Sequence, residues 1–195
     1  MKEYPASRIR NIVLLGHGGS GKTVLAEAVL YNAKAIDRLG KPADGNTTMD
    51  FDPEEIRRQV SINTALAACE WKDTKLNLID TPGDFDFVGE VMQGMRVADS
   101  AVIVVAAKDG VAVGTEKAVR ACKKAGKPIF FYVSRMDEAN ADFGKTLEQL
   151  REFFGASVTP FMLPIVENGT MTGFVDVIGK KAFSLGANGD YKECP

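Results

Sequence analysis

The chain has 195 residues, of which 45% are hydrophobic and 26% charged, with a formal net charge of −2. This composition suits a soluble globular protein, and the near-neutral charge gives no reason to expect DNA binding. Its three cysteines, Cys69, Cys122 and Cys194, have no metal-site or disulfide spacing and fit a reducing cytoplasm. Since we find no signal peptide and no apolar run long enough to span a bilayer, we expect a cytoplasmic protein without membrane contact.

The stretch from Gly16 to Thr23 reads GHGGSGKT and fits the phosphate-binding pattern G-x-x-x-x-G-K-[ST]. An apolar run at 8–15 precedes it and helical spacing follows at 24–35, so the required strand, loop and helix are all predicted. Glycines let backbone N–H groups approach phosphate oxygens, Lys22 can neutralise the β- and γ-phosphates, and the Thr23 hydroxyl can ligate Mg²⁺. The predicted phosphate-binding residues are Gly16, His17, Gly18, Gly19, Ser20, Gly21, Lys22 and Thr23.

Residues 37–60 are polar and have no long apolar period. A loop of this length is usually functional or mobile, and behind a phosphate-binding loop we interpret it as a nucleotide-sensing switch rather than a surface insertion. Residues 61–70 predict a strand, because Ile62, Thr64, Leu66 and Ala68 alternate with polar or small residues, and residues 75–80 predict a second strand. The second ends at Asp80, which begins the sequence Asp-Thr-Pro-Gly83. An aspartate at the carboxyl end of a strand lies where α/β proteins bind ligands and could hold Mg²⁺ through water; a simple turn aspartate is the alternative.

The remaining sequence alternates predicted helices and strands. Helices are predicted at 85–98 and 111–126 and from Asp142 to Gly155, and strands at 100–107, 128–133 and 158–166. The first of these helices carries one apolar face, formed by Phe85, Val88, Met92, Met95 and Ala98. From Gly169 onward, short antiparallel strands are predicted. Alternating strands and helices indicate an α/β fold with a mostly parallel sheet and helices on both faces.

Three motifs follow predicted strands in the order of a GTPase: the loop at 16–23, the Asp-Thr-Pro-Gly sequence at 80–83, and Ser-Arg-Met-Asp at 134–137. With them, the chain resembles translational GTPases, most closely the amino-terminal region of elongation factor G and its paralogues. Ile56–Ile62 also resembles the end of that family's first switch. The resemblance covers nearly the whole chain and implies the fold of a P-loop NTPase.

The resemblance also implies a domain division. Residues 1–165 would form the GTPase domain without its fifth nucleotide motif, and residues 166–195 would form the start of an antiparallel insertion subdomain. Because Pro195 would end inside that insertion, we expect the chain to be part of a longer protein. The ribosome is the implied partner of the full-length protein, and we expect the isolated chain to be a monomer.

The implied cofactors are GTP or GDP and Mg²⁺. Thr23 and Ser61 would ligate the metal, and Asp80 would hold one of its waters. The Gly83 N–H would sense the γ-phosphate, and Asp137 would accept hydrogen bonds from guanine, which disfavours the alternative of a P-loop ATPase. The residues with catalytic roles would be Lys22, Gly83 and Asp84.

Several positions depart from the family pattern. Asp84 stands where the family has a histidine that orients the attacking water, and Gly19 replaces a common loop aspartate. Ser134 and Arg135 replace the asparagine and lysine of the base-reading tetrad, which would still contact the nucleotide through Ser134, Arg135 and Asp137. Two functions therefore stay open: a GTPase acting in translation elongation, and a nucleotide-binding switch with weak or absent hydrolysis.

Overall fold

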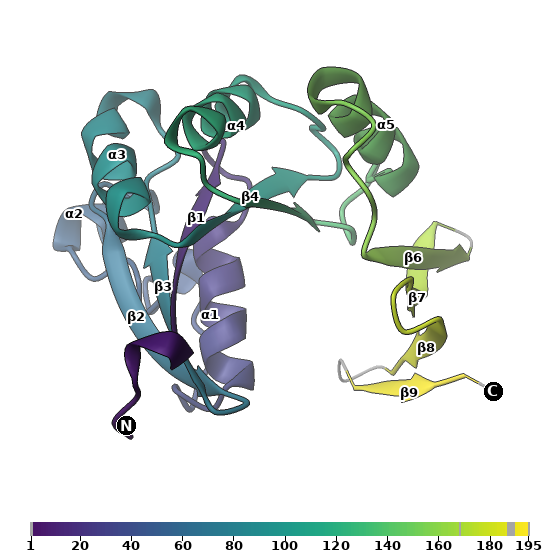
Figure 1. Cartoon of the computed structure of the whole chain (residues 1–195), viewed down its shortest axis with the longest axis horizontal. Helices are drawn as coiled ribbons and strands as arrows, with labels where there is room; N and C mark the ends of the chain where they lie inside the picture. Colours follow the sequence, from purple (N-terminus) through teal and green to yellow (C-terminus); the bar gives the residue numbers. More distant parts are fainter. Residues whose placement is uncertain (1, 168, 187–189, 195) are drawn as a thin grey trace. The chain divides into compact units, whose positions relative to one another are not determined.

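A computed structural model describes residues 2–167, 169–186 and 190–194 of the chain (Figure 1). The chain divides into two compact units. The first contains the residues up to 105 together with 112–134, and the second contains 106–111 and the residues from 135 onward. Pro195, where we expect the insertion to be cut, lies outside the described residues.

The first unit is built on a five-stranded sheet in the order β2-β3-β1-β4-β5. Its strands are β1 (Ile9–Gly16), β2 (Ala65–Trp71), β3 (Thr74–Asp80), β4 (Ser100–Ala106) and β5 (Ile129–Ser134). Strand β1 pairs in parallel with both β3 and β4, so that Leu14 lies between Asp80 and Val102, while β2 joins β3 as an antiparallel edge strand. The predicted mostly parallel sheet is therefore confirmed.

Helices cover both faces of this sheet, as predicted. They are α1 (Lys22–Asn32), α2 (Pro53–Arg58), α3 (Val88–Val97) and α4 (Val113–Ala125), with short 3-10 turns η1 (Ala6–Arg8), η2 (Pro42–Asp44) and η3 (Phe85–Phe87). Leu14 of β1 belongs to one buried cluster with Leu30 of α1, whereas the preceding residue of the strand, Val13, lies against Gly94 of α3. Because successive strand residues point to opposite sides, α1 and α3 pack on opposite faces.

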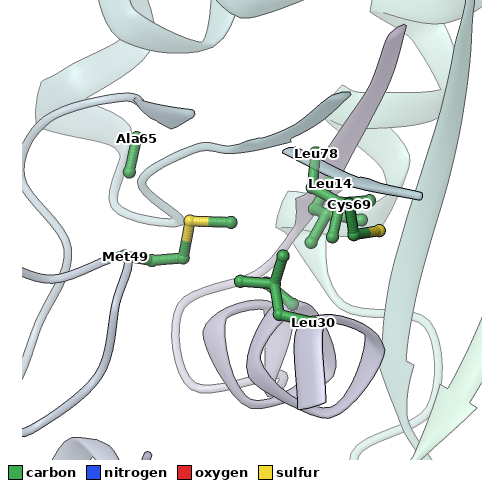
Figure 2. Close-up of a cluster of buried hydrophobic side chains, with 7 residues drawn as sticks. Leu14, Leu30, Met49, Ala65, Cys69 and Leu78 are labelled. Carbon is green, nitrogen blue, oxygen red and sulfur yellow. The ribbon is translucent and has the colours of Figure 1, made fainter. Parts of the chain in front are cut away.

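A hydrophobic cluster lies between α1 and the sheet (Figure 2). Its buried members are Leu14, Ala26, Leu30, Met49, Ala65, Cys69 and Leu78. Figure 2 shows Leu30 projecting from α1 toward the sheet, with Met49 beside it. Met49 is only 1% exposed and comes from the segment 37–60. That segment is thus anchored in the core and contains η2 and α2, so it is more structured than its polar sequence indicates.

The predicted strand at 61–70 begins later than expected. Strand β2 starts at Ala65, and its buried residues are Ala65 and Cys69, whereas Leu66 is 68% exposed. The apolar alternation that starts at Ile62 therefore gave the wrong face. The antiparallel register with β3 decides which side of this edge strand meets α1, and local alternation does not contain that information.

The predicted helix at 85–98 also differs. It begins with η3, and α3 starts only at Val88. Of the predicted apolar face, Met95 and Ala98 are buried, whereas the side chains of Phe85, Val88 and Met92 are exposed. The helix approaches the sheet through Gly94, next to Met95, and this close contact leaves the amino-terminal part of the predicted face open to solvent.

The described residues of the second unit form one helix and a four-stranded sheet. Helix α5 (Phe143–Phe154) is capped by Asp142, whose carboxylate accepts the Lys145 N–H at 2.9 Å, and it ends at Gly155 as predicted. The sheet has the order β6-β7-β8-β9, with antiparallel pairing throughout, and this confirms the predicted antiparallel segment. Its strands are β6 (Met162–Glu167), β7 (Thr170–Asp176), β8 (Lys181–Leu185) and β9 (Tyr191–Glu193). Among the described residues, no helix has the length and apolar character that crossing a membrane requires.

Candidate functional site

The loop between β1 and α1 has a backbone that only glycine adopts readily. Gly16, Gly19 and Gly21 have φ angles of 144°, 77° and 94°, all in the region that disfavours side chains. A Cβ at Gly16 would also overlap the Val104 carbonyl oxygen of the neighbouring strand. Gly21 then caps α1 without a side chain, and the N-terminus of this helix lies at the loop. The glycines of the sequence pattern thus shape a loop suited to an anion.

The Lys22 side chain lies inside this loop. Its Nζ donates hydrogen bonds to the carbonyl oxygens of Gly16 and His17 at 3.2 and 3.1 Å, and the residue is 6% exposed. Burial lowers the pKa of Lys22, while the nearby carboxylates of Asp80 and Asp50 raise it. A partly desolvated ammonium among carbonyl oxygens is well placed to meet a more strongly charged partner such as a phosphate.

Three residues of the predicted metal site meet at the start of α1. The Thr23 hydroxyl donates to Asp80 Oδ2 at 2.7 Å and lies 3.2 Å from the Ser61 hydroxyl. Ser61 in turn donates to Asp50 Oδ1 at 2.7 Å. Residues from α1, from the end of β3 and from the segment before β2 therefore form one cluster of oxygens, and Asp50 is a member that the sequence did not indicate.

Asp80 is the most buried acid of this cluster, at 2% exposed. Burial raises its pKa to about 6, although the hydrogen bond from Thr23 and the charge of Lys22 lower it. Within the described part of the chain, Asp80 Oδ1 and the Ser20 hydroxyl are buried without a hydrogen-bond partner. Buried polar atoms are usually satisfied, so these two oxygens fit a site completed by a ligand.

The oxygen atoms of this cluster suit Mg²⁺, which prefers oxygen ligands. Proteins usually bind this ion through one or two carboxylates, together with waters and phosphate oxygens. No group of three or more His, Cys, Asp or Glu side chains among the described residues is placed to hold a metal ion.

The segment after β3 lies directly against the loop. A Cβ at Gly83 would lie 2.5 Å from Lys22 Nζ and 2.7 Å from the Gly18 nitrogen, so the two backbones approach too closely for any side chain. The next residue, Asp84, is exposed, and its carboxylate accepts the Asp86 N–H at 3.3 Å as the cap of η3. Gly83 thus faces the site, whereas the Asp84 side chain is engaged in its own turn.

The predicted base-reading residues lie on both sides of the boundary between the two units. Ser134, at the end of β5, donates its hydroxyl hydrogen to the Ser20 carbonyl at 2.6 Å, so it joins the loop. Arg135 and Asp137 belong to the second unit. There, Arg135 pairs with Glu138, which also accepts from Lys108 at 2.6 Å, and Asp137 is exposed in a turn.

Two buried carboxylates that the sequence analysis missed hold the segment 37–60. Glu27 of α1 is fully buried and accepts the Thr48 N–H at 2.5 Å and the Gly40 N–H at 3.2 Å. Glu55 of α2 is 1% exposed and forms a capping box with Asp52. The capping-box spacing of aspartate and glutamate is readable in the sequence and could have indicated α2, whereas nothing in the sequence marks Glu27.

Comparisons with known proteins agree with this geometry. The family model for the elongation factor Tu GTP-binding domain matches residues 7–187. The chain is 42% identical over 156 residues to proteins called elongation factor G-like from two strains of Mycobacterium tuberculosis, CDC 1551 / Oshkosh and ATCC 25618 / H37Rv; the match covers 80% of this chain and 22% of theirs.

A crystal structure of a protein from Thermus thermophilus matches 97% of this chain and 28% of its own, with a TM-score of 0.91 and 37% identity. The chain thus spans less than a third of the length of these relatives. Since the family model covers most of its length, the chain belongs to the family of the elongation factor Tu GTP-binding domain.

Proposed function

We propose that this chain is the GTP-binding domain of an elongation factor G-like translational GTPase, which couples GTP binding and hydrolysis to ribosome action in translation elongation. The observation that carries the proposal is the meeting of Lys22, Thr23, Asp80 and Gly83 at one glycine-shaped loop. The identity to elongation factor G-like proteins supports the ribosome as the partner of the full-length protein.

The phosphates bind to the loop at 16–23, with Lys22 beside the β- and γ-phosphates. Thr23 and Ser61 would ligate Mg²⁺, and Asp80 would reach it through water; the buried Asp80 and Ser20 oxygens that lack a hydrogen-bond partner support this assignment. A bound Mg²⁺ would neutralise part of the phosphate charge. Gly83 lies close enough to Lys22 for its N–H to respond to the γ-phosphate.

The base is bound by the tetrad at 134–137. Asp137 accepts two hydrogen bonds from guanine. It rejects adenine, because adenine does not offer these donors and leaving the carboxylate without them costs free energy. Arg135 stacks on the base through its planar guanidinium. Ser134 holds the phosphate loop through its bond to the Ser20 carbonyl and has no amide to offer the base.

In the full-length protein, residues 1–165 act as the GTPase domain without its fifth nucleotide motif, and residues 166–195 begin an insertion subdomain. The antiparallel sheet supports a distinct carboxyl-terminal segment, and its first strand, β6, runs across the proposed boundary, from Met162 to Glu167. We further propose a monomeric isolated chain and a cytoplasmic location; the three free cysteines are in keeping with the location.

A second function is a nucleotide-binding switch with weak or absent hydrolysis. The observation in its favour is the Asp84 carboxylate, which is exposed and caps η3. This residue stands where the family's histidine would orient the attacking water, and an anion near the γ-phosphate opposes that role.

The test has two stages. Calorimetric titration with GTP, GDP and ATP in the presence of Mg²⁺ should show binding of both guanine nucleotides and much weaker binding of ATP. Equal affinity for ATP would contradict the guanine assignment. Single-turnover GTP hydrolysis by the full-length protein, with and without ribosomes, then separates the two functions, since a ribosome-stimulated rate favours the GTPase and tight binding without turnover favours the switch.

A further inference from the structure

The backbone directly after Ser61 is held by a buried carboxylate on α2. Glu55 Oε1 accepts the N–H groups of Ile62 and Asn63, both at 2.9 Å. The other oxygen of Glu55 accepts the Asp52 N–H at 3.2 Å. Hydrogen bonds from N–H groups to a carboxylate are stronger than those between neutral groups, and Glu55 is almost fully buried. Glu55 thus fixes the path of the chain on the carboxyl side of Ser61.

A second carboxylate, from α3, holds the next residue. Glu90 Oε2 accepts the Thr64 N–H at 2.7 Å, and the Thr64 hydroxyl donates to the Glu90 carbonyl oxygen at 3.1 Å. Helix α3 follows Gly83 and η3 in the chain. Three consecutive N–H groups, at 62–64, therefore donate to carboxylates from two different helices.

We infer that Glu55 and Glu90 are positioning residues that hold the Ser61 hydroxyl in place for Mg²⁺ and link α2 and α3 to the affinity for the metal. The inference rests on the proposed function, in which Ser61 is a metal ligand. Neither carboxylate contacts the Thr23–Ser61–Asp80 oxygens; both act through the backbone of residues 62–64.

The short side chain of Ser61 makes this support necessary. With one carbon between backbone and hydroxyl, any shift of the backbone moves the oxygen almost equally. Its present place is 3.2 Å from the Thr23 hydroxyl and 2.7 Å from Asp50 Oδ1. Ligands need positioning to about 0.5 Å, and loss of groups that orient a ligand typically weakens metal binding about 10- to 100-fold.

The test compares Glu55→Ala and Glu90→Ala in the full-length protein, with Glu54→Ala as the matched control. Glu54 lies on the same helix and forms its ion pairs at the surface, with Arg57 and Arg58. In Glu55→Ala, the N–H groups of Asp52, Ile62 and Asn63 all lose their acceptor. The readouts are the Mg²⁺ concentration for half-maximal binding of a fluorescent non-hydrolysable GTP analogue, and GDP affinity in EDTA.

We expect the Mg²⁺ midpoint to rise about tenfold or more in Glu55→Ala, and to rise less in Glu90→Ala, where only the Thr64 N–H loses its acceptor. GDP affinity in EDTA should be unchanged, and Glu54→Ala should match the wild type in both readouts. A Mg²⁺ midpoint equal to that of the wild-type protein in both variants would overturn the inference. So would a fall in metal-free GDP affinity by the same factor, because that marks general damage to the fold.

Two further outcomes are distinguishable. If the wild-type protein binds neither nucleotide, the proposed function fails and not this inference alone. If Glu55→Ala does not fold, Glu90→Ala decides: faster hydrogen exchange of the Thr64 amide together with a raised Mg²⁺ midpoint supports the link from α3, and faster exchange with a wild-type midpoint overturns it.

Discussion

A Cβ on Gly83 would lie 2.5 Å from Lys22 Nζ and 2.7 Å from the Gly18 nitrogen. The lysine could move, but the Gly18 backbone cannot do so without distorting the phosphate loop. We therefore expect Gly83→Ala to lower GDP affinity at least tenfold in calorimetric titration. Gly89→Ala is the matched control: its Cβ would meet nothing within 4 Å, and replacing glycine inside α3 should raise stability by up to about 1 kcal/mol. Wild-type GDP affinity in Gly83→Ala would contradict the close approach.

Lys22→Ala should abolish detectable nucleotide binding while the protein stays folded. The reason is that the ammonium bonds only to the loop carbonyls of Gly16 and His17, and its burial already disfavours the charged form. Removing it therefore costs the fold little but removes the charge that meets the phosphates. Calorimetry with GDP and a thermal melt measure both effects, and Lys124→Ala, exposed on α4, is the control. Unchanged GDP affinity in Lys22→Ala would refute its phosphate role.

Glu27→Ala should loosen the segment before α2. The substitution leaves the N–H groups of Gly40 and Thr48 without their acceptor, at about 1–3 kcal/mol for the buried group of Gly40 and less for that of the exposed Thr48. We expect hydrogen exchange at both amides to accelerate strongly, while the core strands stay protected. Glu152→Ala, exposed on α5, should have no such effect.

Apart from the amides bonded to buried carboxylates, the backbone amides of residues 37–60 should exchange quickly in wild-type protein that has no γ-phosphate bound. Hydrogen-exchange protection equal to that of β1 would contradict this prediction.

The parts of the fold that follow from local pattern were predictable. Three such features depend only on residues that are neighbours in the sequence. They are the glycines of the phosphate loop, the strand that ends at Asp80, and the helix cap at Asp142. The structure contains all three.

What the sequence did not reveal depends on contacts between distant segments. Met49 is buried because it packs in the cluster that residues of α1 and β2 form. Glu27 is buried because its hydrogen-bond partners, at 40 and 48, fold back over α1. The buried face of β2 is likewise set by its register with β3. No local period encodes such burial, so polar composition alone made the segment 37–60 look less structured than it is.

The buried thiols should be unreactive at pH 8. Burial raises the pKa of Cys122 to about 11 and also raises the pKa of Cys69, whereas Cys194 is only half-buried. A raised thiol pKa favours the unfolded state once pH rises above the unfolded value of about 9, because only the unfolded thiol then ionises freely; below that pH the shift has no effect on stability. In native protein at pH 8, a thiol reagent should modify Cys194 first, and in denaturant it should modify all three thiols. Rapid modification of Cys122 in native protein would contradict its burial.

The last prediction concerns Asp84, whose substitution should restore hydrolysis. Two like charges about 4 Å apart repel by about 4 kcal/mol at an effective dielectric near 20, so an aspartate is poorly suited to meet water beside a γ-phosphate. The Asp84 carboxylate instead caps η3 through the Asp86 N–H. A neutral imidazole at this position carries no such charge and can accept a proton from water. We expect Asp84→His to raise the ribosome-stimulated rate of the full-length protein about tenfold or more.

The same substitution should barely change GDP affinity, because GDP has no γ-phosphate to meet position 84. Asp86→His is the matched control, since it places an imidazole two residues away on the same exposed turn and should leave the rate unchanged. Hydrolysis by stopped-flow phosphate release and GDP binding by calorimetry measure the two effects separately. If the wild-type rate already equals that of an ordinary elongation factor G, and Asp84→His is slower, then the aspartate takes part in catalysis and the repulsion argument is wrong.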